Sequence, residues 1–458
     1  MAPDPAELDV CLRVLEQAEA ADPDDPRWRA VHDATTRLYR AGKKWRKAAR
    51  RADQLRQDRA AIAAAERFRE QDPSPAPEHA TPPAVRRELT GKHRCYVCKA
   101  RYRYVRQDYH LLCDPCAEEN LARRHARCDL RGRTAVVTGG RIKIGFHVAL
   151  KLLRDGAEVL VTTRFPRDAA RRFAAVPDSA DWLDRLHVHG VDFLDLPAVA
   201  GLIADLHRRF DHLDILVNNA AQTIRRPSAY HREARAAEAL PLTGAAASVD
   251  LLETGARPLP GAGRHLPEIT GRHLPESAAE VLFPTGRKDE TGQPLDLRER
   301  NSWTLRLHEV EPAEWMEAQV VNAFVPFLLT GRLRGLLEAS PWPDRYIVQV
   351  SAMEGSFSRE HKTVRHPHTN MAKASLNMLT RTAAADYAAA GIHMNSVDTG
   401  WVTDERPHPS KTAQREAGFR PPLDVVDGAA RIYDPIVRGV GGQPVSGLFL
   451  KDYRAVEW

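Results

Sequence analysis

The feature that most restricts the possible folds of this chain is a strand, a glycine-rich turn and a helix in direct succession. Residues 133–138, with the sequence RTAVVT, are typical of a buried strand. They lead into GGRIKIG at 139–145, and an amphipathic helix is predicted over 146–154. In this order, backbone N–H groups and a helix N-terminus can hold a pyrophosphate. The sequence therefore predicts an α/β domain that binds a dinucleotide.

Three further motifs follow in the order and spacing of one protein family. Asp192 follows a predicted third strand, NNAA at 218–221 follows a fourth, and NSVDTG occupies 395–400. With the glycine-rich turn, they make the chain resemble the short-chain dehydrogenase/reductase family over residues 130–400. The match has departures, because Lys143 replaces the middle glycine of the family's T-G-x-x-x-G-x-G motif. Alanine also replaces the glycine of N-N-A-G, and threonine replaces the proline of N-x-V-x-P-G.

The resemblance implies a Rossmann-type, doubly wound parallel sheet for residues 129–458, with a bound dinucleotide. It also implies a small-molecule substrate with a carbonyl or alcohol group. Members of the family commonly form homo-oligomers through the helices that correspond to those bearing Asn322 and Lys373. The residues expected to contact the dinucleotide are Thr138, Gly139, Arg141, Lys143, Ile144, Gly145, Thr163, Arg164, Asp192, Asn219 and Lys373.

The end of the predicted second strand bears on the choice between NAD(H) and NADP(H). An acidic residue there would bind the ribose 2′-OH of NAD, but this chain has Thr163 followed by Arg164. Arginine favours a 2′-phosphate, and Arg141 is a second candidate for that contact. We therefore expect NADP(H) rather than NAD(H), although Arg164 could instead stack on the adenine.

The family's catalytic set of asparagine, serine, tyrosine and lysine is only partly matched. Asn322 in VVNAF corresponds to the asparagine, and Lys373 in MAKASL corresponds to the lysine. The tyrosine position, one helical turn before that lysine, holds Thr369. The serine position holds Ala352, with Ser351 beside it. The expected catalytic residues are therefore Asn322, Ser351, Thr369 and Lys373.

The absence of the tyrosine leaves the proton donor open. A phenol has a pKa of about 10 that a nearby cation can lower, whereas an aliphatic hydroxyl is a far weaker acid. His366 and His368 precede the vacant position, and an imidazole titrates near pH 6.5 (about the unperturbed value). Tyr230, from a long insertion, is a third candidate donor.

Two classes of function fit these residues. The main hypothesis is an NADP(H)-dependent oxidoreductase that acts on a carbonyl or alcohol with a non-standard proton donor. The alternative is a catalytically inactive NADP(H)-binding sensor or scaffold that engages a protein partner through its N-terminal regions. Asn322 and Lys373 fit both, because the lysine can hold the cofactor ribose with or without turnover.

Four of the six cysteines form two C-x-x-C pairs, a pattern typical of metal binding in a reducing compartment. Cys95, Cys98, Cys113 and Cys116 can surround one tetrahedral Zn²⁺ in a small module over 90–128. Four sulfur ligands leave no open coordination position, so the zinc is expected to be structural. The module would brace the neighbouring domain or recognise another protein.

The remaining segments complete the predicted organisation. Residues 1–70 are expected to be helical and basic, and 71–89 form a proline-rich linker. The segment 27–70 has a net charge of +9, whereas the whole chain has +6, so the rest of the chain is slightly acidic. A solvated helix face is favoured over a nucleic-acid surface, and a protein partner remains possible. At about 223–305 the alternation of strands and helices stops, which indicates an insertion that folds over the site, or a disordered loop.

No run of about 18 apolar residues predicts a membrane span. The N-terminal sequence MAPDPAELDV lacks the basic and apolar parts of a signal peptide. The chain is therefore expected to be cytoplasmic, without membrane association.

Overall fold

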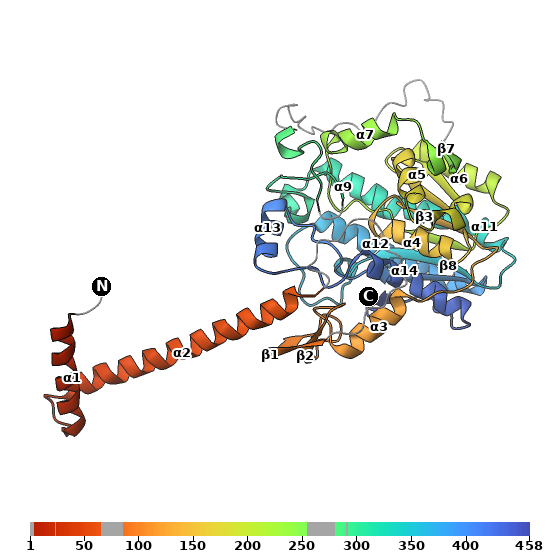
Figure 1. Cartoon of the computed structure of the whole chain (residues 1–458). Coiled ribbons are helices and arrows are strands. Elements are labelled where there is room, and N and C mark those ends of the chain that lie inside the picture. Colours follow the sequence, from red (N-terminus) through yellow and green to blue (C-terminus); the bar gives the residue numbers. More distant parts are fainter. Residues whose placement is uncertain (1–3, 23, 66–85, 254–279, 290–291) are drawn as a thin grey trace.

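The computed structural model describes residues 4–22, 24–65, 86–253, 280–289 and 292–458. Most of the predicted proline-rich linker lies outside the described residues. Figure 1 shows a rounded body that holds the large sheet and most helices, and one long helix that projects from it.

A nine-stranded sheet forms the centre of the body, in the order β11-β10-β9-β8-β6-β3-β4-β5-β7. Neighbouring strands are parallel except for β10 and β11. The chain moves outward from β3 to β5 and then returns to β6 on the other side of β3, which confirms the predicted doubly wound sheet. The strands are β3 (Thr134–Thr138), β4 (Glu158–Thr163), β5 (Leu186–Gly190), β6 (Ile215–Asn218), β7 (Asp250–Glu253), β8 (Arg345–Ser351), β9 (Ile392–Asp398), β10 (Phe449–Lys451) and β11 (Arg454–Val456).

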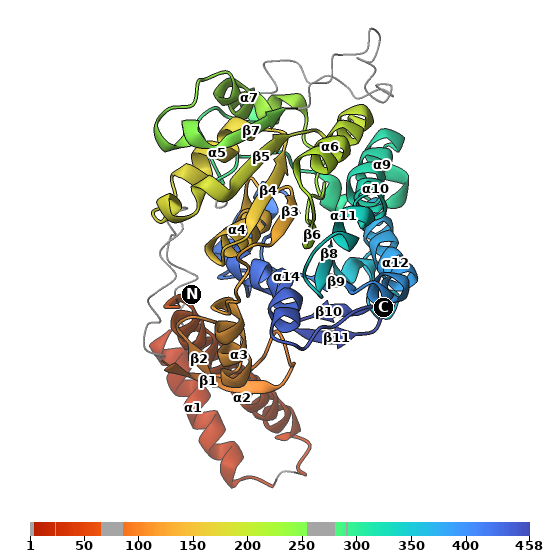
Figure 2. The ribbon, with the colours of Figure 1, turned by 90° about the vertical axis from the view of Figure 1, so that its right-hand side faces the viewer.

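Helices cover both faces of this sheet (Figure 2). Side chains alternate along a strand, so Val137 and Val159 enter one apolar core while Val136 and Leu160 enter the other. Burial on both faces is the reason why the central strands are almost continuously apolar. The first core is covered by α4 (Lys143–Arg154), α5 (Pro166–Ala174) and α14 (Val425–Val440). The second is covered by α6 (Leu196–Arg209), α10 (Val325–Arg332), α11 (Arg334–Glu338) and α12 (Pro367–Ala389).

The described part of the insertion is folded onto the body. A short turn, η4 (Ser228–His231), leads into α7 (Arg232–Glu238), and β7 extends the sheet beside β5. The Glu238 carboxylate accepts hydrogen bonds from the backbone N–H groups of Arg167 and Asp168, at 2.9 and 2.7 Å. It therefore satisfies free donors at the start of α5 and attaches α7 to the body.

The remaining elements connect these layers. The helices are α9 (Pro312–Gln319), the π-helical turn η8 (Val320–Phe324) and α13 (His408–Glu416). The 3₁₀ turns are η2 (Ser179–Asp181), η3 (Leu183–Arg185), η5 (Gly244–Ser248), η6 (Ser302–Thr304), η7 (Leu307–Glu309) and η9 (Met353–Gly355).

The cysteine-rich segment forms a hairpin of β1 (Arg86–Arg94) and β2 (Arg101–Arg106), followed by α3 (Asp114–Arg124). The hairpin begins inside the stretch assigned to the linker, because β1 pairs with the full length of β2. Helix α3 packs on α14, where Arg124 Nη1 lies 2.7 Å from Asp424 and 2.9 Å from Asp427. The module is therefore docked on the nucleotide-binding domain.

Two helices form the N-terminal region, as predicted: α1 (Pro5–Ala20) and the long α2 (Arg29–Ala63). Helix α2 projects from the body and meets the β1 hairpin near its C-terminal end (Figure 1). There the buried Asp58 accepts hydrogen bonds from the N–H groups of Thr90 and Gly91, at 2.6 and 3.0 Å. None of the described helices is both long and apolar enough to cross a membrane.

Candidate active site

A large cavity of about 1030 Å³ lies at the carboxyl ends of the parallel strands. Its walls come from the segments that follow β3, β4, β5, β6, β8 and β9. Ligands bind at this edge of open α/β sheets, where the strand order reverses. The insertion also forms part of the wall, through Thr223, Ile224, Arg226, Tyr230, His231, Gln293 and Trp303.

The glycine-rich turn, at 139–145, packs too tightly for larger residues at two positions. Gly139 has φ +68°, and a Cβ added to it would lie 2.9 Å from Ala220 Cα. A Cβ added to Gly145 would lie 2.4 Å from the Gly139 carbonyl oxygen. Helix α4 begins at Lys143, so its free N–H groups lie at the cavity that Ile144 and Gly145 line. This arrangement fits the pyrophosphate of a dinucleotide.

Thr138 and Asn219 hold this turn in place. The Thr138 hydroxyl oxygen accepts hydrogen bonds from the N–H groups of Asn219 and Ala220, both at 2.9 Å. The Asn219 side chain donates to the carbonyls of Thr138 and Gly139, at 3.0 and 3.2 Å. Asn219 lines the cavity, but Thr138 does not. The structure therefore gives Thr138 a supporting position beneath the turn.

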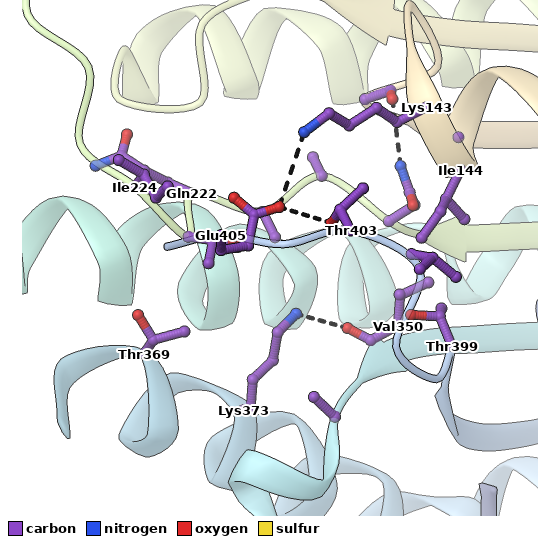
Figure 3. A pocket seen from close by; sticks show the side chains of 18 of the residues that line it. Lys143, Ile144, Gln222, Ile224, Val350, Thr369, Lys373, Thr399, Thr403 and Glu405 are labelled. Atoms are coloured by element: carbon purple, nitrogen blue, oxygen red, sulfur yellow. Dashed lines mark hydrogen bonds and ion pairs between the residues drawn. The ribbon is translucent and has the colours of Figure 1, made fainter. Parts of the chain in front are cut away.

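Lys143 has a left-handed backbone, with φ +54°, at the position where the family motif has glycine. Its ammonium nitrogen lies 3.8 Å from Glu405 Oε1, and the Thr403 hydroxyl donates to the same carboxylate at 2.7 Å (Figure 3). Attraction to Glu405 raises the pKa of Lys143. Burial alone would raise the pKa of Glu405. The positive charge of Lys143 and the hydrogen bond from Thr403 act against burial, and the pKa of Glu405 is lowered. This ion pair joins the glycine-rich turn to the segment after β9.

Three basic side chains surround the ring of Phe165 beyond the end of β4. The guanidinium carbons of Arg141 and Arg164 lie 5.1 and 5.7 Å from the ring centre, and the His231 ring lies 5.5 Å away. Arg164 Nη2 is 3.4 Å from His231 Nε2. Burial, followed by the charges of Arg164 and Arg141, lowers the pKa of His231 to about 3. Arg141 Nη1 also lies 2.5 Å from Asp168 Oδ2, so its charge is paired with this carboxylate. With a neutral imidazole at His231, Arg164 supplies the remaining positive charge of this subsite.

Two other predicted cofactor residues line this end of the cavity. The Thr163 hydroxyl accepts a hydrogen bond from Phe165 N at 3.1 Å. The Asp192 carboxylate accepts one from Leu194 N at 3.0 Å. Both side chains therefore shape the turns that follow their strands.

Thr369 and Lys373 lie one turn apart on one face of helix α12, and His366 is the residue that caps the start of this helix. All three line the cavity. The Lys373 ammonium donates to the Val350 carbonyl at 2.7 Å, and burial lowers its pKa to about 8 (Figure 3). The buried Thr369 hydroxyl has no hydrogen-bond partner within the described residues.

His366 is fixed more firmly than the other candidate proton donors. It has φ +43° at the start of α12, and its ring stacks on Trp303 with 3.9 Å between the ring centres. Its Nδ1 lies 2.8 Å from Asn370 Oδ1. Because an amide oxygen only accepts, Nδ1 carries the hydrogen and Nε2 is left to exchange a proton. Burial lowers the pKa of His366.

The other two candidates occupy different places. His368 is buried outside the cavity wall, 3.6 Å from Glu314. Tyr230 does line the cavity, but the Arg226 guanidinium lies 4.5 Å above its ring. Burial raises the pKa of Tyr230, and Lys143 is among the charges that act on it. Tyr230 therefore lies near the end of the cavity that Lys143 and the glycine-rich turn line.

Asn322 and Ser351 are both engaged with backbone groups. Asn322 lies in the π-helical turn η8, a type of irregularity that is frequent at functional sites. Its amide accepts from Gln222 N at 2.6 Å and donates to Gln222 O at 3.1 Å, behind the cavity wall. Ser351 lines the cavity, and its hydroxyl donates to the Lys373 carbonyl at 3.3 Å.

The four cysteines of the two C-x-x-C pairs come together as predicted. Their sulfur atoms all lie within 4.8 Å of one another, and none forms a disulfide. The knuckle after β1 supplies Cys95 and Cys98, and the start of α3 supplies Cys113 and Cys116. This donor set suits one tetrahedral metal ion.

His231 and Glu405 were not predicted from the sequence as site residues. His231 follows Tyr230 in the insertion, and Glu405 lies in a loop after the N-x-V-x-P-G-like motif. Neither belongs to a motif with fixed spacing. Only the contacts with Arg164 and Lys143 show their relevance.

Comparisons with known proteins match the architecture. A family profile described as "short chain dehydrogenase" matches residues 133–246, and one described as "Enoyl-(Acyl carrier protein) reductase" matches residues 300–418. The uncharacterized protein R665 of Acanthamoeba polyphaga mimivirus is 32% identical over 360 residues, which is 75% of this chain and 71% of that protein. Carbonyl reductase [NADPH] 1 of Sus scrofa is 37% identical over 105 residues, or 22% of this chain and 35% of that protein.

Among solved structures, an NADPH-bound carbonyl reductase from chicken fatty liver is 17% identical, with a TM-score of 0.44. The alignment covers 72% of this chain and 100% of the carbonyl reductase chain. Other curated relatives, which include the Sus scrofa reductase, match over 23–39% of their own lengths. The sheet order agrees with the two family profiles. This chain belongs to the short-chain dehydrogenase/reductase family.

Proposed function

We propose that the protein is an NADP(H)-dependent oxidoreductase that interconverts a carbonyl compound and an alcohol, with His366 as the proton donor. The observation that carries this proposal is the arrangement at the start of α12. His366, which caps the helix, and Thr369 and Lys373, which lie on it, line the cavity that the glycine-rich turn also lines. A fold alone does not establish a reaction, so the argument rests on these side chains.

The residues present fit a dinucleotide. The glycine-rich turn and the start of α4 would hold the pyrophosphate, and Lys143 adds a positive charge beside it. Lys373 would hold the nicotinamide ribose. When bound, NADPH supplies a hydride to the carbonyl carbon.

The 2′-phosphate would lie among Arg141, Arg164 and His231. These residues come from the glycine-rich turn, the end of β4 and the insertion, and they surround Phe165. Arginine pairs strongly with phosphate oxygens. Arg164→Asp should therefore weaken NADPH binding by about tenfold or more, with little loss of NADH binding. Equal losses for both nucleotides would contradict this assignment.

His366 is the proton donor best supported by the contacts. Its Nδ1–H donates to Asn370 Oδ1, which leaves Nε2 to carry the exchangeable proton. In reduction, Nε2–H would protonate the carbonyl oxygen as the C–H bond forms, and the neutral imidazole remains. Thr369 would orient the same oxygen by hydrogen bonding, since its buried hydroxyl has no other partner within the described residues.

The cysteine cluster would bind one structural Zn²⁺. Four sulfur ligands close the tetrahedral coordination shell, so the metal would hold the β1 hairpin to α3 and take no part in the reaction. Purified protein should contain about one zinc per chain, as measured by atomic absorption.

The test is NADPH oxidation with a broad panel of aldehydes and ketones. We expect turnover by the wild-type protein, no turnover by Lys373→Ala and a strong loss in His366→Asn. His361→Asn is a matched control, because His361 is exposed and does not line the cavity. If NADPH binds but the whole panel gives no turnover, the protein is instead the non-catalytic NADP(H)-binding scaffold.

A further inference from the structure

The first cysteine knuckle, residues 95–99, reaches the wall of the nucleotide-binding cavity. Tyr96 and Lys99 both line this cavity, although they belong to the metal module. The knuckle is held at its base, where Cys95 N donates to Ala100 O at 2.9 Å and Tyr96 N donates to Leu111 O at 2.8 Å. The cavity is therefore completed by a segment outside the family's common domain.

Tyr96 fixes the knuckle to the end of β9. Its hydroxyl oxygen accepts a hydrogen bond from Trp401 N at 2.9 Å. A Cβ added to Gly400 would lie 3.5 Å from the same hydroxyl oxygen. The segment that begins at Gly400 thus packs directly on Tyr96. Asp398 is the last residue of β9, and its carboxylate accepts a hydrogen bond from Met353 N at 2.7 Å. Met353 follows the end of β8, the strand that bears Ser351.

Lys99 occupies a left-handed backbone conformation, with φ +62°. Such a conformation costs about 1 kcal/mol or more for a residue with a Cβ. Its ammonium donates to the Tyr96 carbonyl and lies 5.0 Å from the centre of the Tyr96 ring. An ammonium group has three N–H donors, so two remain for a ligand.

No carboxylate among the described residues forms an ion pair with Lys99. Within the described residues, Lys99 and Lys362 have backbone carbonyls as their hydrogen-bond partners, those of Tyr96 and Glu354. Neither forms an ion pair there. Other cations in the wall do form such pairs: Arg359 with Glu354, Arg406 with Asp404, and Lys451 with Asp398. Among the described residues, Lys99 therefore presents an ammonium group without an ion-pair partner at the cavity wall.

Contacts between α3 and α14 hold the module in this position. Arg123 Nη1 lies 2.7 Å from Asp434, and Arg431 Nη2 donates to Asn120 Oδ1 at 2.7 Å. Arg431 is almost fully buried, so this contact is shielded from water. These contacts fix α3, which bears Cys116, on the sheet domain.

We propose that the knuckle is a substrate-recognition element, in which Lys99 binds an anionic group of the carbonyl substrate beside Tyr96. The substrate class is then a carbonyl compound that bears a carboxylate or a phosphate. This inference rests on the proposed function, because it assigns the substrate of the same site. It also gives the metal module a role in specificity.

Matched substrate pairs test the proposal. The carboxylate pair is 4-carboxybenzaldehyde and its methyl ester, and the phosphate pair is glyceraldehyde 3-phosphate and glyceraldehyde. The wild-type protein should prefer the anionic member of at least one pair. Lys99→Ala should reduce that preference by about fivefold through KM, with kcat and the NADPH Kd unchanged. Lys92→Ala is the control, because Lys92 is exposed in the same hairpin and does not line the cavity.

A binding measurement separates this inference from the proposed reaction. Calorimetry with benzoate and the NADP⁺ complex needs no turnover. Wild-type and Lys92→Ala proteins should bind benzoate, and Lys99→Ala should bind it more weakly. Cys98→Ser should lower both the zinc content and benzoate affinity. No preference in either pair, no loss in Lys99→Ala, or a loss of NADPH affinity in that variant would overturn the inference. Benzoate binding that depends on Lys99, without any carbonyl turnover, would reject the proposed reaction and leave Lys99 as an anion-binding residue.

Discussion

Three polar residues of the cavity wall have a left-handed backbone conformation. Lys99, Lys143 and His366 have φ values of +62°, +54° and +43°. This conformation is unfavourable for residues other than glycine and persists only where the surrounding structure imposes it. In each case the side chain extends to a specific partner: a carbonyl, a carboxylate or an amide oxygen. Local strain thus coincides with the positions to which we assign binding and proton transfer.

The proposed role of His366 predicts a pH dependence. Burial lowers its pKa below 6.5, so the protonated form, which is needed for reduction, is lost as pH rises through that lower value. The kcat/KM for carbonyl reduction should therefore fall with increasing pH in this range, and that for alcohol oxidation should rise. His366→Asn should remove this dependence of kcat/KM on pH, as stopped-flow assays across pH would show. If kcat/KM instead changed only near the pKa of a tyrosine, Tyr230 would be indicated as the proton donor.

Lys143 offers a second prediction at this scale. Lys143→Gly removes a charge beside the pyrophosphate, so the NADPH Kd should rise by about tenfold. Its melting temperature should not fall much, because glycine relieves the positive φ while the Glu405 ion pair is lost. Glu405→Gln should have the opposite effect on affinity, since it removes a negative charge near the phosphates. Fluorescence titration with NADPH measures both variants. A weaker Kd in Glu405→Gln would contradict this assignment.

At the scale of elements, the sequence predicted individual strands, helices and motifs better than the long-range contacts between them. The strand, turn and helix around the glycine-rich motif agree with the structure because backbone sterics and apolar periodicity act over a few residues. The two C-x-x-C pairs were equally informative, since four sulfur ligands require a compact site. The addition of β7 to the sheet was not predicted. Pairing with β5 depends on residues from distant parts of the chain, which no local pattern encodes.

The junction between α2 and the β1 hairpin has a predictable pH response. Burial alone would raise the pKa of Asp58, but hydrogen bonds from Thr90, Gly91 and His93 outweigh it and lower the pKa. A lowered pKa in the folded state means that this contact stabilises the junction above the unfolded pKa and is lost as pH falls through the folded value. The amides of Thr90 and Gly91 should therefore lose hydrogen-exchange protection below about pH 4. Asp58→Asn should lack this change, and protection that is independent of pH in the wild-type protein would contradict the prediction.

At the scale of the whole molecule, the body has two unlike extensions. The module lies on α14 and contributes to the cavity, whereas α2 extends away from the body (Figure 1). Leu38 and Trp45 of α2 are 71% and 72% exposed, so these apolar side chains of α2 are not covered by the described residues. Along another side of the molecule, α9, α10 and α12 lie together (Figure 2).

That helical side should mediate self-association. Phe324, Phe327 and Met378 there are 40%, 56% and 55% exposed, and exposed apolar groups of this size favour an interface. Phe327→Glu should therefore shift a dimer or tetramer toward the monomer, as measured by light scattering during gel filtration. Leu38→Glu is the control, because Leu38 is equally apolar but lies on α2. A monomeric wild-type protein at micromolar concentration would contradict this prediction.

The sequence by itself determined the winding order of the sheet through its family motifs. It also determined the glycine-rich turn, the cluster of four cysteines and the replacement of tyrosine by Thr369. These features depend on residues close together in the chain or on fixed motif spacing. The tertiary structure alone decided that His366 lies in the cavity wall while His368 does not, and that His231, Glu405 and Lys99 reach the same cavity. Their positions depend on how loops and the metal module close around the sheet. Such long-range convergence leaves no periodic trace in the sequence.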